Sequence, residues 1–234
     1  MKKRIVVPLL SLALTACGMD LAIMDKSEAV KAEPEIPVKT SGDFWGFGRE
    51  GTFEVAGLYH GKYSRDISES NWFFNRINIK DGSLVAEVTK NSDNTTWLLV
   101  CSGGGTSVHY LGVDFGGVDP YTCKISLNDK PVGEYKMEPD SSFIKIGIEK
   151  KETGFMRLGN DLMNVETVHS SDSLMMPVEM ALGYSFKLGS GEVAATQSNG
   201  MITIQMLSTL TDSQKDTVVV GSIASALSWR PDEE

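Results

Sequence analysis

The residues that could do chemistry are scattered along this chain and match no catalytic or metal-binding pattern. Each of the three histidines, His60, His109 and His169, stands alone, without the short spacing of a metal-binding pair. A glycine-rich stretch over 101–107 lacks the lysine of a phosphate-binding loop, and no G-x-S-x-G motif of a serine hydrolase occurs. The sequence therefore predicts a protein that is not an enzyme and that needs no metal and no cofactor.

The first 16 residues have the layout of a secretory signal peptide. Three basic residues precede an apolar stretch over 5–14, which is too short for a permanent membrane span. The next residues, Leu14-Thr15-Ala16-Cys17-Gly18, resemble the lipobox of bacterial lipoproteins. This resemblance implies cleavage before Cys17 and lipidation of its thiol, with the membrane as partner. An ordinary signal peptide followed by a chance cysteine is the alternative.

The resemblance to lipoproteins also implies a destination. In lipoproteins of the Gram-negative type, an Asp directly after the lipidated Cys resembles a signal for retention in the inner membrane. Here Gly18 occupies that position and Met19 follows. In a cell with two membranes, we expect a protein that is lipid-anchored in the outer membrane and faces the periplasm.

Two further cysteines, Cys101 and Cys123, remain as an even pair. In an oxidising compartment such a pair favours a structural disulfide. A redox pair is the weaker interpretation, because the C-x-x-C spacing that lowers a thiol pKa is missing.

The charge of the mature chain argues against nucleic acid as a partner. Three of the 22 basic residues lie in the signal peptide and none of the 31 acidic residues do, which leaves a net charge of about −12 after cleavage. A strongly acidic surface is repelled by phosphate backbones and by anionic lipid headgroups.

Two groups of aromatic residues, the first of them interspersed with glycines, offer a candidate binding surface. They are Phe44, Trp45, Phe47, Trp72 and Phe73. Large rings are enriched at interfaces and at sugar or lipid sites, although the same residues could instead cover one end of the core. The methionines 175, 176 and 180 leave a similar choice between an adaptable surface and the filling of core gaps.

The elements that must position these residues change in character near residue 42. Residues 17–42 carry scattered charges, two prolines and no aromatic residue, which predicts a lipidated Cys followed by a flexible tether. Residues 43–234 are expected to form a single β-rich globular domain. Its strands are expected near 52–59, 72–79, 83–89, 95–101, 107–113, 121–127, 132–137, 143–149, 163–168, 179–188, 192–197 and 201–207.

The C-terminal region predicts a helix. Thr211 and Gln214 match a capping box, and the run 218–227 is apolar or small on every side, so such a helix must be buried or inserted in lipid. It is slightly short for a membrane span, which favours burial. A β-strand over 217–223 is the rival, because the valine triplet has high β propensity.

About a dozen strands followed by an apolar C-terminal helix resemble the tubby/scramblase-like barrel, in which a helix threads a closed sheet. The resemblance covers the order of elements and includes no shared motif, so it assigns no residue a role. We therefore expect a mainly β fold, either an antiparallel barrel or a two-sheet sandwich, with a buried C-terminal helix.

Together these features predict a non-catalytic, membrane-anchored envelope lipoprotein. Its β domain would bind or scaffold another envelope component, a protein or a lipid. A carrier or sensor of an apolar ligand is the alternative, and an enzyme of unknown type comes third.

Overall fold

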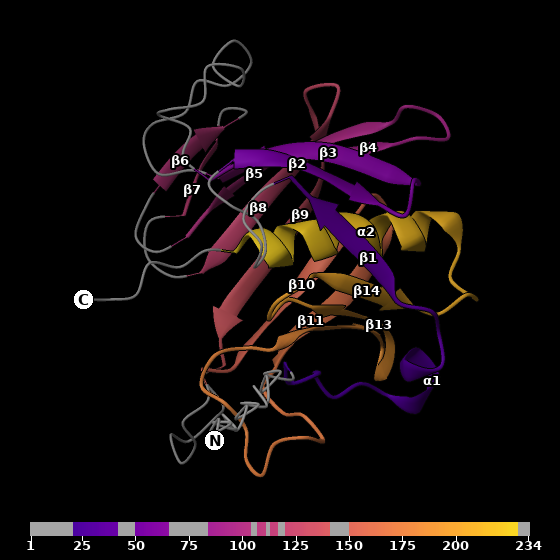
Figure 1. Cartoon of the computed structure of the whole chain (residues 1–234). Helices are drawn as coiled ribbons and strands as arrows, with labels where there is room; N and C mark the ends of the chain where they lie inside the picture. Colours follow the sequence, from indigo (N-terminus) through magenta and orange to yellow (C-terminus); the bar gives the residue numbers. More distant parts are fainter. Residues whose placement is uncertain are drawn as a thin grey trace, which may run out of the picture.

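Most of the described chain forms a closed barrel of antiparallel strands around one helix (Figure 1). The structure is a computed structural model and describes residues 21–41, 50–65, 84–103, 107–110, 113–116, 120–140 and 150–228, with backbone only for 107–110 and 113–116. The helices are α1 (Glu28–Lys31) and α2 (Asp212–Leu227). The barrel strands are β1 (Ile36–Thr40), β2 (Glu50–Val55), β3 (Tyr59–Ser64), β4 (Leu84–Lys90), β5 (Thr96–Ser102), β8 (Tyr121–Leu127), β9 (Lys130–Pro139), β10 (Glu152–Leu158), β11 (Asp161–Val168), β12 (Gly183–Leu188), β13 (Gly191–Gln197) and β14 (Thr203–Met206).

Neighbours in the barrel are mostly neighbours in sequence. The order runs β2-β3-β4-β5-β8 and continues through β9 to β14, and β1 closes the ring between β14 and β2. The strands β6 (Ser107–Tyr110) and β7 (Val113–Gly116) form a separate hairpin. The expected barrel is thus present, and the two-sheet sandwich is not.

Turn chemistry explains how successive strands reverse direction. Asn128 and Asp129 are residue types that favour tight turns, and both have positive φ angles, 51° and 61°. Two such residues in succession form the type of tight turn whose twist matches a β-hairpin. They connect β8 to β9, while Gly189 (φ 61°) begins the turn from β12 to β13.

The segment expected to be a tether is largely part of the folded domain. Ile36 and Pro37 pair with β14, while Val38 is buried and pairs with Val55 of β2. The expected boundary at residue 42 is therefore wrong for residues 21–41. With its scattered charges and two prolines, this segment has no local pattern typical of a strand. It forms a strand because it pairs with β2 and β14, and β14 is distant in the sequence.

Other strands agree with expectation or differ in specific places. The expected strands from 83 to 101, 121 to 137 and 163 to 207 correspond to β4, β5, β8, β9 and β11 to β14. The expected strand 52–59 ends early at a turn in which Ala56 has a φ of 49°, and the expected strand 107–113 is the hairpin β6–β7. The strands β3 and β10 were not expected, and those near 72–79 and 143–149 lie outside the described residues.

The predicted capping box begins α2. Thr211 Oγ1 accepts from the backbone N–H of Gln214 at 3.3 Å, and Gln214 Oε1 accepts from the backbone N–H of Thr211 at 3.0 Å. Both bonds satisfy amide groups that the first turn of a helix leaves free. The rival strand over 217–223 is wrong, since these residues lie within α2.

Figure 1 shows α2 running between β2–β4 on one side and β10–β14 on the other. Its side chains and backbone contact strands all around the ring: β3 and β4 near its start, and β8, β9, β12 and β13 farther along. A helix with partners on opposite walls lies inside the barrel. This position explains why a segment apolar on every side is stable here, because it is surrounded by protein.

Candidate functional site

The barrel interior is occupied by α2. The side chains of Val218, Val220, Ile223 and Leu227 are fully buried. Gly221 lies so close to the wall that a Cβ at this position would come within 2.8 Å of Phe186 Cε1. The helix and the wall are therefore packed directly against each other, as expected for a barrel filled by side chains.

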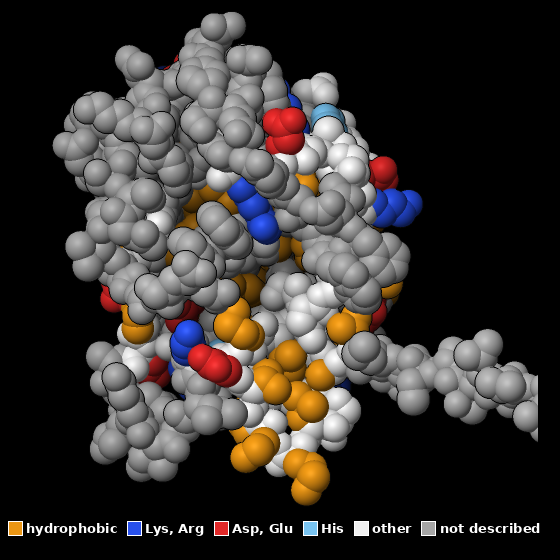
Figure 2. Space-filling model, turned by 60° about the vertical axis from the view of Figure 1, so that its left-hand side comes forward, with side chains coloured by type: hydrophobic (Ala, Val, Ile, Leu, Met, Phe, Trp, Pro, Cys, Tyr) orange, Lys and Arg blue, Asp and Glu red, His pale blue; other side chains and the backbone are white. Residues whose placement is uncertain are grey.

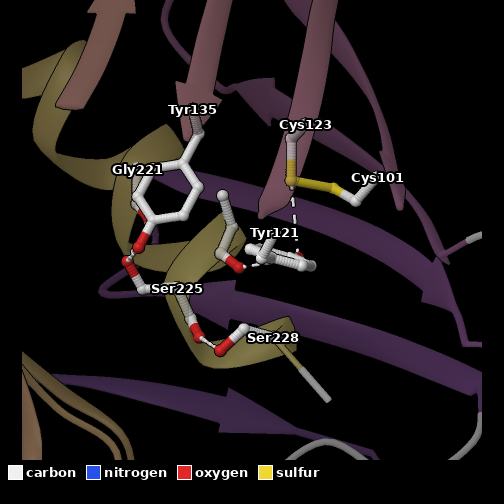
Figure 3. Close-up of a disulfide and its surroundings, with 8 residues drawn as sticks. Cys101, Tyr121, Cys123, Tyr135, Gly221, Ser225 and Ser228 are labelled. Atoms are coloured by element: carbon white, nitrogen blue, oxygen red, sulfur yellow. Dashed lines mark hydrogen bonds between the residues drawn. A yellow bond between two sulfur atoms is a disulfide. The ribbon is translucent and has the colours of Figure 1, made fainter. Parts of the chain in front are cut away.

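Hydrogen bonds join the polar groups of α2 to the wall (Figure 3). Tyr121 Oη donates to the carbonyl of Ala224 at 3.0 Å, and Ser225 Oγ hydrogen-bonds to Tyr135 Oη at 2.8 Å. Farther around the ring, Thr196 Oγ1 donates to Ser222 Oγ at 2.7 Å. Buried polar groups are costly unless they are paired, so these bonds favour one rotation of the helix inside the barrel.

The expected disulfide joins Cys101 to Cys123 and lies in the wall beside α2 (Figure 3). The two cysteines face each other directly on the neighbouring strands β5 and β8. Tyr121 Oη, which holds the helix at Ala224, lies 3.4 Å from Cys123 Sγ. The bond thus fixes the part of the wall to which the second half of the helix is attached.

A second polar cluster holds the first half of α2. Tyr59 Oη donates to Asp216 Oδ1 at 2.5 Å, and Lys90 Nζ lies 2.9 Å from Asp216 Oδ2. Burial, together with the Asp216 carboxylate, raises the pKa of Tyr59. The hydrogen bond to Asp216 likewise raises the pKa of Lys90. Asp216 therefore lies between a tyrosine hydroxyl and a lysine ammonium, in an arrangement that attaches the helix to two strands of the wall.

The histidines of the described chain have structural partners. His169 is buried, with Nδ1 3.0 Å from the Val178 carbonyl and Nε2 2.9 Å from Thr167 Oγ1. The ring of His60 contacts Asn91 Oδ1. The side chain of His109 lies outside the described residues. Across the ranges that the structure describes, no three His, Cys, Asp or Glu side chains gather as a metal site would require.

Several candidates from the sequence lie outside the described residues. They are the lipidation site Cys17 and the aromatic surface residues Phe44, Trp45, Phe47, Trp72 and Phe73. Of the site residues predicted from the sequence, the structure therefore brings together only the cysteine pair.

An exposed apolar surface at one end of the barrel is the site that the sequence did not predict. We call it the methionine patch and define it by six side chains: Leu21, Ile23, Met175, Met176, Met180 and Met201. The described chain has eight large exposed hydrophobic side chains, so only two lie elsewhere, Leu58 and Leu162. Figure 2 shows apolar side chains gathered at the lower end of the molecule, the end at which α1 lies in Figure 1.

Strand register explains why the patch residues share one end. Val168 pairs with Gly183, Gly183 with Gln197, and Gln197 with Thr203. The connections that follow β11 and β13, residues 169–182 and 198–202, therefore leave the barrel side by side. The three methionines of the patch at 175–180 lie on the first connection and Met201 lies on the second.

Two parts of this patch have an incomplete signal in the sequence. Methionines 175, 176 and 180 fit either an adaptable surface or the filling of core gaps, and the second interpretation is the commoner one for methionine. Met175 is fully exposed and the other two are 67% exposed, so that interpretation is wrong. Leu21 and Ile23 fall in the expected tether, whose composition predicts no binding surface.

Comparisons with known proteins add no relationship: no family model, no curated protein and no solved structure matches this chain. Over the residues that the structure describes, neither helix is both long and apolar enough to cross a bilayer. The fold and the site thus define a helix-filled antiparallel barrel with an apolar patch at one end.

Proposed function

We propose that this protein is an exported lipoprotein, anchored through acylated Cys17, whose barrel is a non-catalytic module that binds or scaffolds another envelope component. The proposed location is the outer membrane, facing the periplasm. The lipobox-like residues 14–18 motivate the anchor, and Gly18 in place of an Asp motivates the destination.

The observation that carries the export part of this proposal is the Cys101–Cys123 disulfide. Disulfides persist in oxidising compartments such as the bacterial periplasm and are rare in the reducing cytosol. Because both sulfur atoms are buried and the bond joins directly opposed residues, it fits a structural role in such a compartment.

The occupied interior supports binding through the outer surface. A carrier of an apolar ligand, the alternative function, would need space that α2 now fills with buried side chains. A carried ligand would therefore have to bind at the mouth of the barrel and not in its interior. The resemblance in element order to the tubby/scramblase-like barrel remains a proposal about fold and supplies no ligand.

The anchor is tested by growing producing cells with an alkyne-bearing fatty acid and detecting label on the protein. We expect label on the wild type and none on Cys17→Ser. The double variant Cys101→Ala/Cys123→Ala is the matched control, since it removes two cysteines but keeps the proposed acceptor. Label that persists in Cys17→Ser would contradict the proposal.

The non-catalytic part is tested with the purified full-length protein and panels of ester, glycoside and peptide substrates. We expect no turnover above background. Turnover that a single substitution abolishes would contradict the proposal. Native mass spectrometry distinguishes this proposal from the carrier alternative, because a carrier would retain a bound lipid in addition to the acyl chains on Cys17.

A further inference from the structure

We infer that the methionine patch rests on the membrane surface, so that the barrel lies against the bilayer with its β11–β12 and β13–β14 connections facing lipid. This inference depends on the proposed function, because it takes Cys17 as the anchored residue. The occupant of the patch is the interfacial layer of a phospholipid membrane.

The chain between the anchor and the domain is short. Leu21 follows Cys17 by four residues, and an extended chain spans at most about 3.6 Å per residue. The Cα atom of Leu21 therefore lies within about 14 Å of that of Cys17 whatever path the chain takes. Since the acyl chains of an anchored Cys17 enter the hydrocarbon, the barrel surface near Leu21 is held at the membrane.

Residues 22–24 are fixed to the barrel by hydrogen bonds. The carbonyl of Ala22 accepts hydrogen bonds from Asn199 Nδ2 at 2.8 Å and from Gln197 Nε2 at 3.1 Å. The backbone N–H of Met24 donates to Gln197 Oε1 at 2.9 Å, and the Met24 side chain is buried. The mature chain thus joins the barrel directly at the start of the β13–β14 connection. A long spacer between anchor and domain is absent from residues 21–41.

The methionine patch surrounds the junction between this segment and the barrel. A Cβ on Gly200 would come within 2.6 Å of Leu21 Cδ1, which places Met201 beside the emerging chain. On the other side, the backbone N–H of Asp25 donates to the carbonyl of Ser170 at 2.9 Å, so the β11–β12 connection lies against the same segment. Exposed apolar side chains therefore lie on both sides of Leu21, the first described residue after the proposed anchor.

The β11–β12 connection also has an inner and an outer face. Leu174 and Val178 pack against a small buried cluster that contains Met24 and Leu182. The intervening methionines point outward, and Met175 is fully exposed. An apolar patch of this kind on a soluble domain marks an interaction surface, and flexible methionines adapt to an irregular one such as lipid.

The charged residues near the patch do not favour binding to anionic lipid, so we expect its apolar side chains to provide the contact with the membrane. Lys31 pairs with Asp172 at 3.3 Å, and Lys150 pairs with Glu179 at 3.2 Å, so the nearby lysines are already matched by acidic groups. The mature chain carries a net charge of about −12, which opposes attraction to anionic headgroups. Contact through methionine and leucine side chains needs no such attraction.

The test uses the full-length protein made in cells that incorporate photo-methionine and photo-leucine, diazirine analogues that cross-link to whatever they touch. After illumination of the membranes, we expect phospholipid adducts on the patch methionines and on Leu21. Leu58 and Leu162 are matched controls, because they are exposed to a similar degree as Leu21 but lie near turns at the other end of the barrel. We expect adducts at least tenfold more abundant on the patch than on these two leucines.

Two failures can be told apart by the mass of the N-terminal peptide in the same sample. An acylated Cys17 together with patch methionines that bear protein adducts, or no lipid adducts, overturns the inference and leaves the anchor standing. A Cys17 without acyl chains overturns the proposed function, and the inference falls with it. Lipid adducts spread equally over the patch and the two control leucines also overturn the inference.

Discussion

Tyr59 on β3 and Asp216 on α2 are joined by a 2.5 Å hydrogen bond that links the barrel wall to the helix inside it. Lys90 on β4 approaches the other carboxylate oxygen at 2.9 Å, so one carboxylate holds two neighbouring strands against the helix. A single acidic residue on a mostly apolar helix thus fixes how its first half is placed.

This arrangement predicts loss of stability in alkali. The pKa of Tyr59 is raised by burial and by Asp216, and the pKa of Lys90 is raised by its bond to Asp216. A group whose pKa is higher in the folded state holds its proton there after the unfolded chain has lost it. The contribution of Tyr59 and Lys90 to the free energy of unfolding is therefore fully present below about pH 10 and is lost as the pH rises further.

Tyr59→Phe tests this relationship. At pH 8 we expect the free energy of unfolding to fall by about 1 kcal/mol, the usual net value of a hydrogen bond. Between pH 10 and 11, the variant should lose stability less steeply than the wild type, because one of the two groups no longer titrates. Urea unfolding at each pH measures both effects. Equal slopes for the two proteins would show that Tyr59 does not contribute to the alkaline loss.

Gly221→Ala tests the packing of helix against wall. The new Cβ would meet Phe186 Cε1 at 2.8 Å and Met156 Cγ at 3.0 Å. Overpacking of this kind costs about 1–3 kcal/mol, against a gain of about 1 kcal/mol from better helix propensity. We expect a net loss of stability, visible as a lower urea midpoint.

The control for this substitution is Gly191→Ala at the first residue of β13. A Cβ at Gly191 comes no closer than 3.8 Å to any neighbour, so its effect should stay within about 0.5 kcal/mol. If Gly221→Ala proved equally harmless, the helix would have to be packed more loosely than its contacts indicate.

Removing the disulfide should destabilise the barrel. The bond closes a loop with a sequence separation of 22, which on the chain-entropy estimate contributes about 3 kcal/mol. We expect Cys101→Ala/Cys123→Ala to unfold at correspondingly lower urea concentration. The wild type should lose a similar amount on reduction, while the double variant should not respond to reductant. A wild type indifferent to reductant would contradict this prediction.

Gly18→Asp tests the proposed destination in a cell with two membranes. The wild type should fractionate with the outer membrane, and the variant should move to the inner membrane. Gly18→Ala is the control and should behave as the wild type. Sucrose-gradient fractionation with markers for both membranes measures the distribution. Wild-type protein found with inner-membrane markers would refute the proposed sorting.

The sequence predicted the elements that are specified locally. The capping box of Thr211 and Gln214 identifies the start of α2, because both its bonds lie within three residues. The turn at Asn128 and Asp129 is likewise specified locally, since these residue types tolerate positive φ. Burial of α2 followed from its apolar character on every side.

The elements specified by distant contacts were missed. The strand β1 exists because Ile36 meets Ile204 and Val38 meets Val55, and neither partner can be read from local composition. In the turn before β3, Ala56 has a φ of 49°, which alanine rarely adopts. No turn motif in the sequence predicts this conformation. The methionine patch was missed because it depends on which connections share an end of the barrel.

The closure of the barrel has a consequence for the timing of folding. The first strand pairs with the last, Ile36 with Ile204, and the core is filled by a helix made later still. During synthesis, the preceding strands emerge before the segments that complete their ring and occupy its centre. Because long-range pairing slows folding, we expect a lag between emergence of the first strands and formation of the native state, in which the unfinished sheet exposes edges that other chains could bind. During that interval, the exposed strand edges would have to be protected from pairing with other chains.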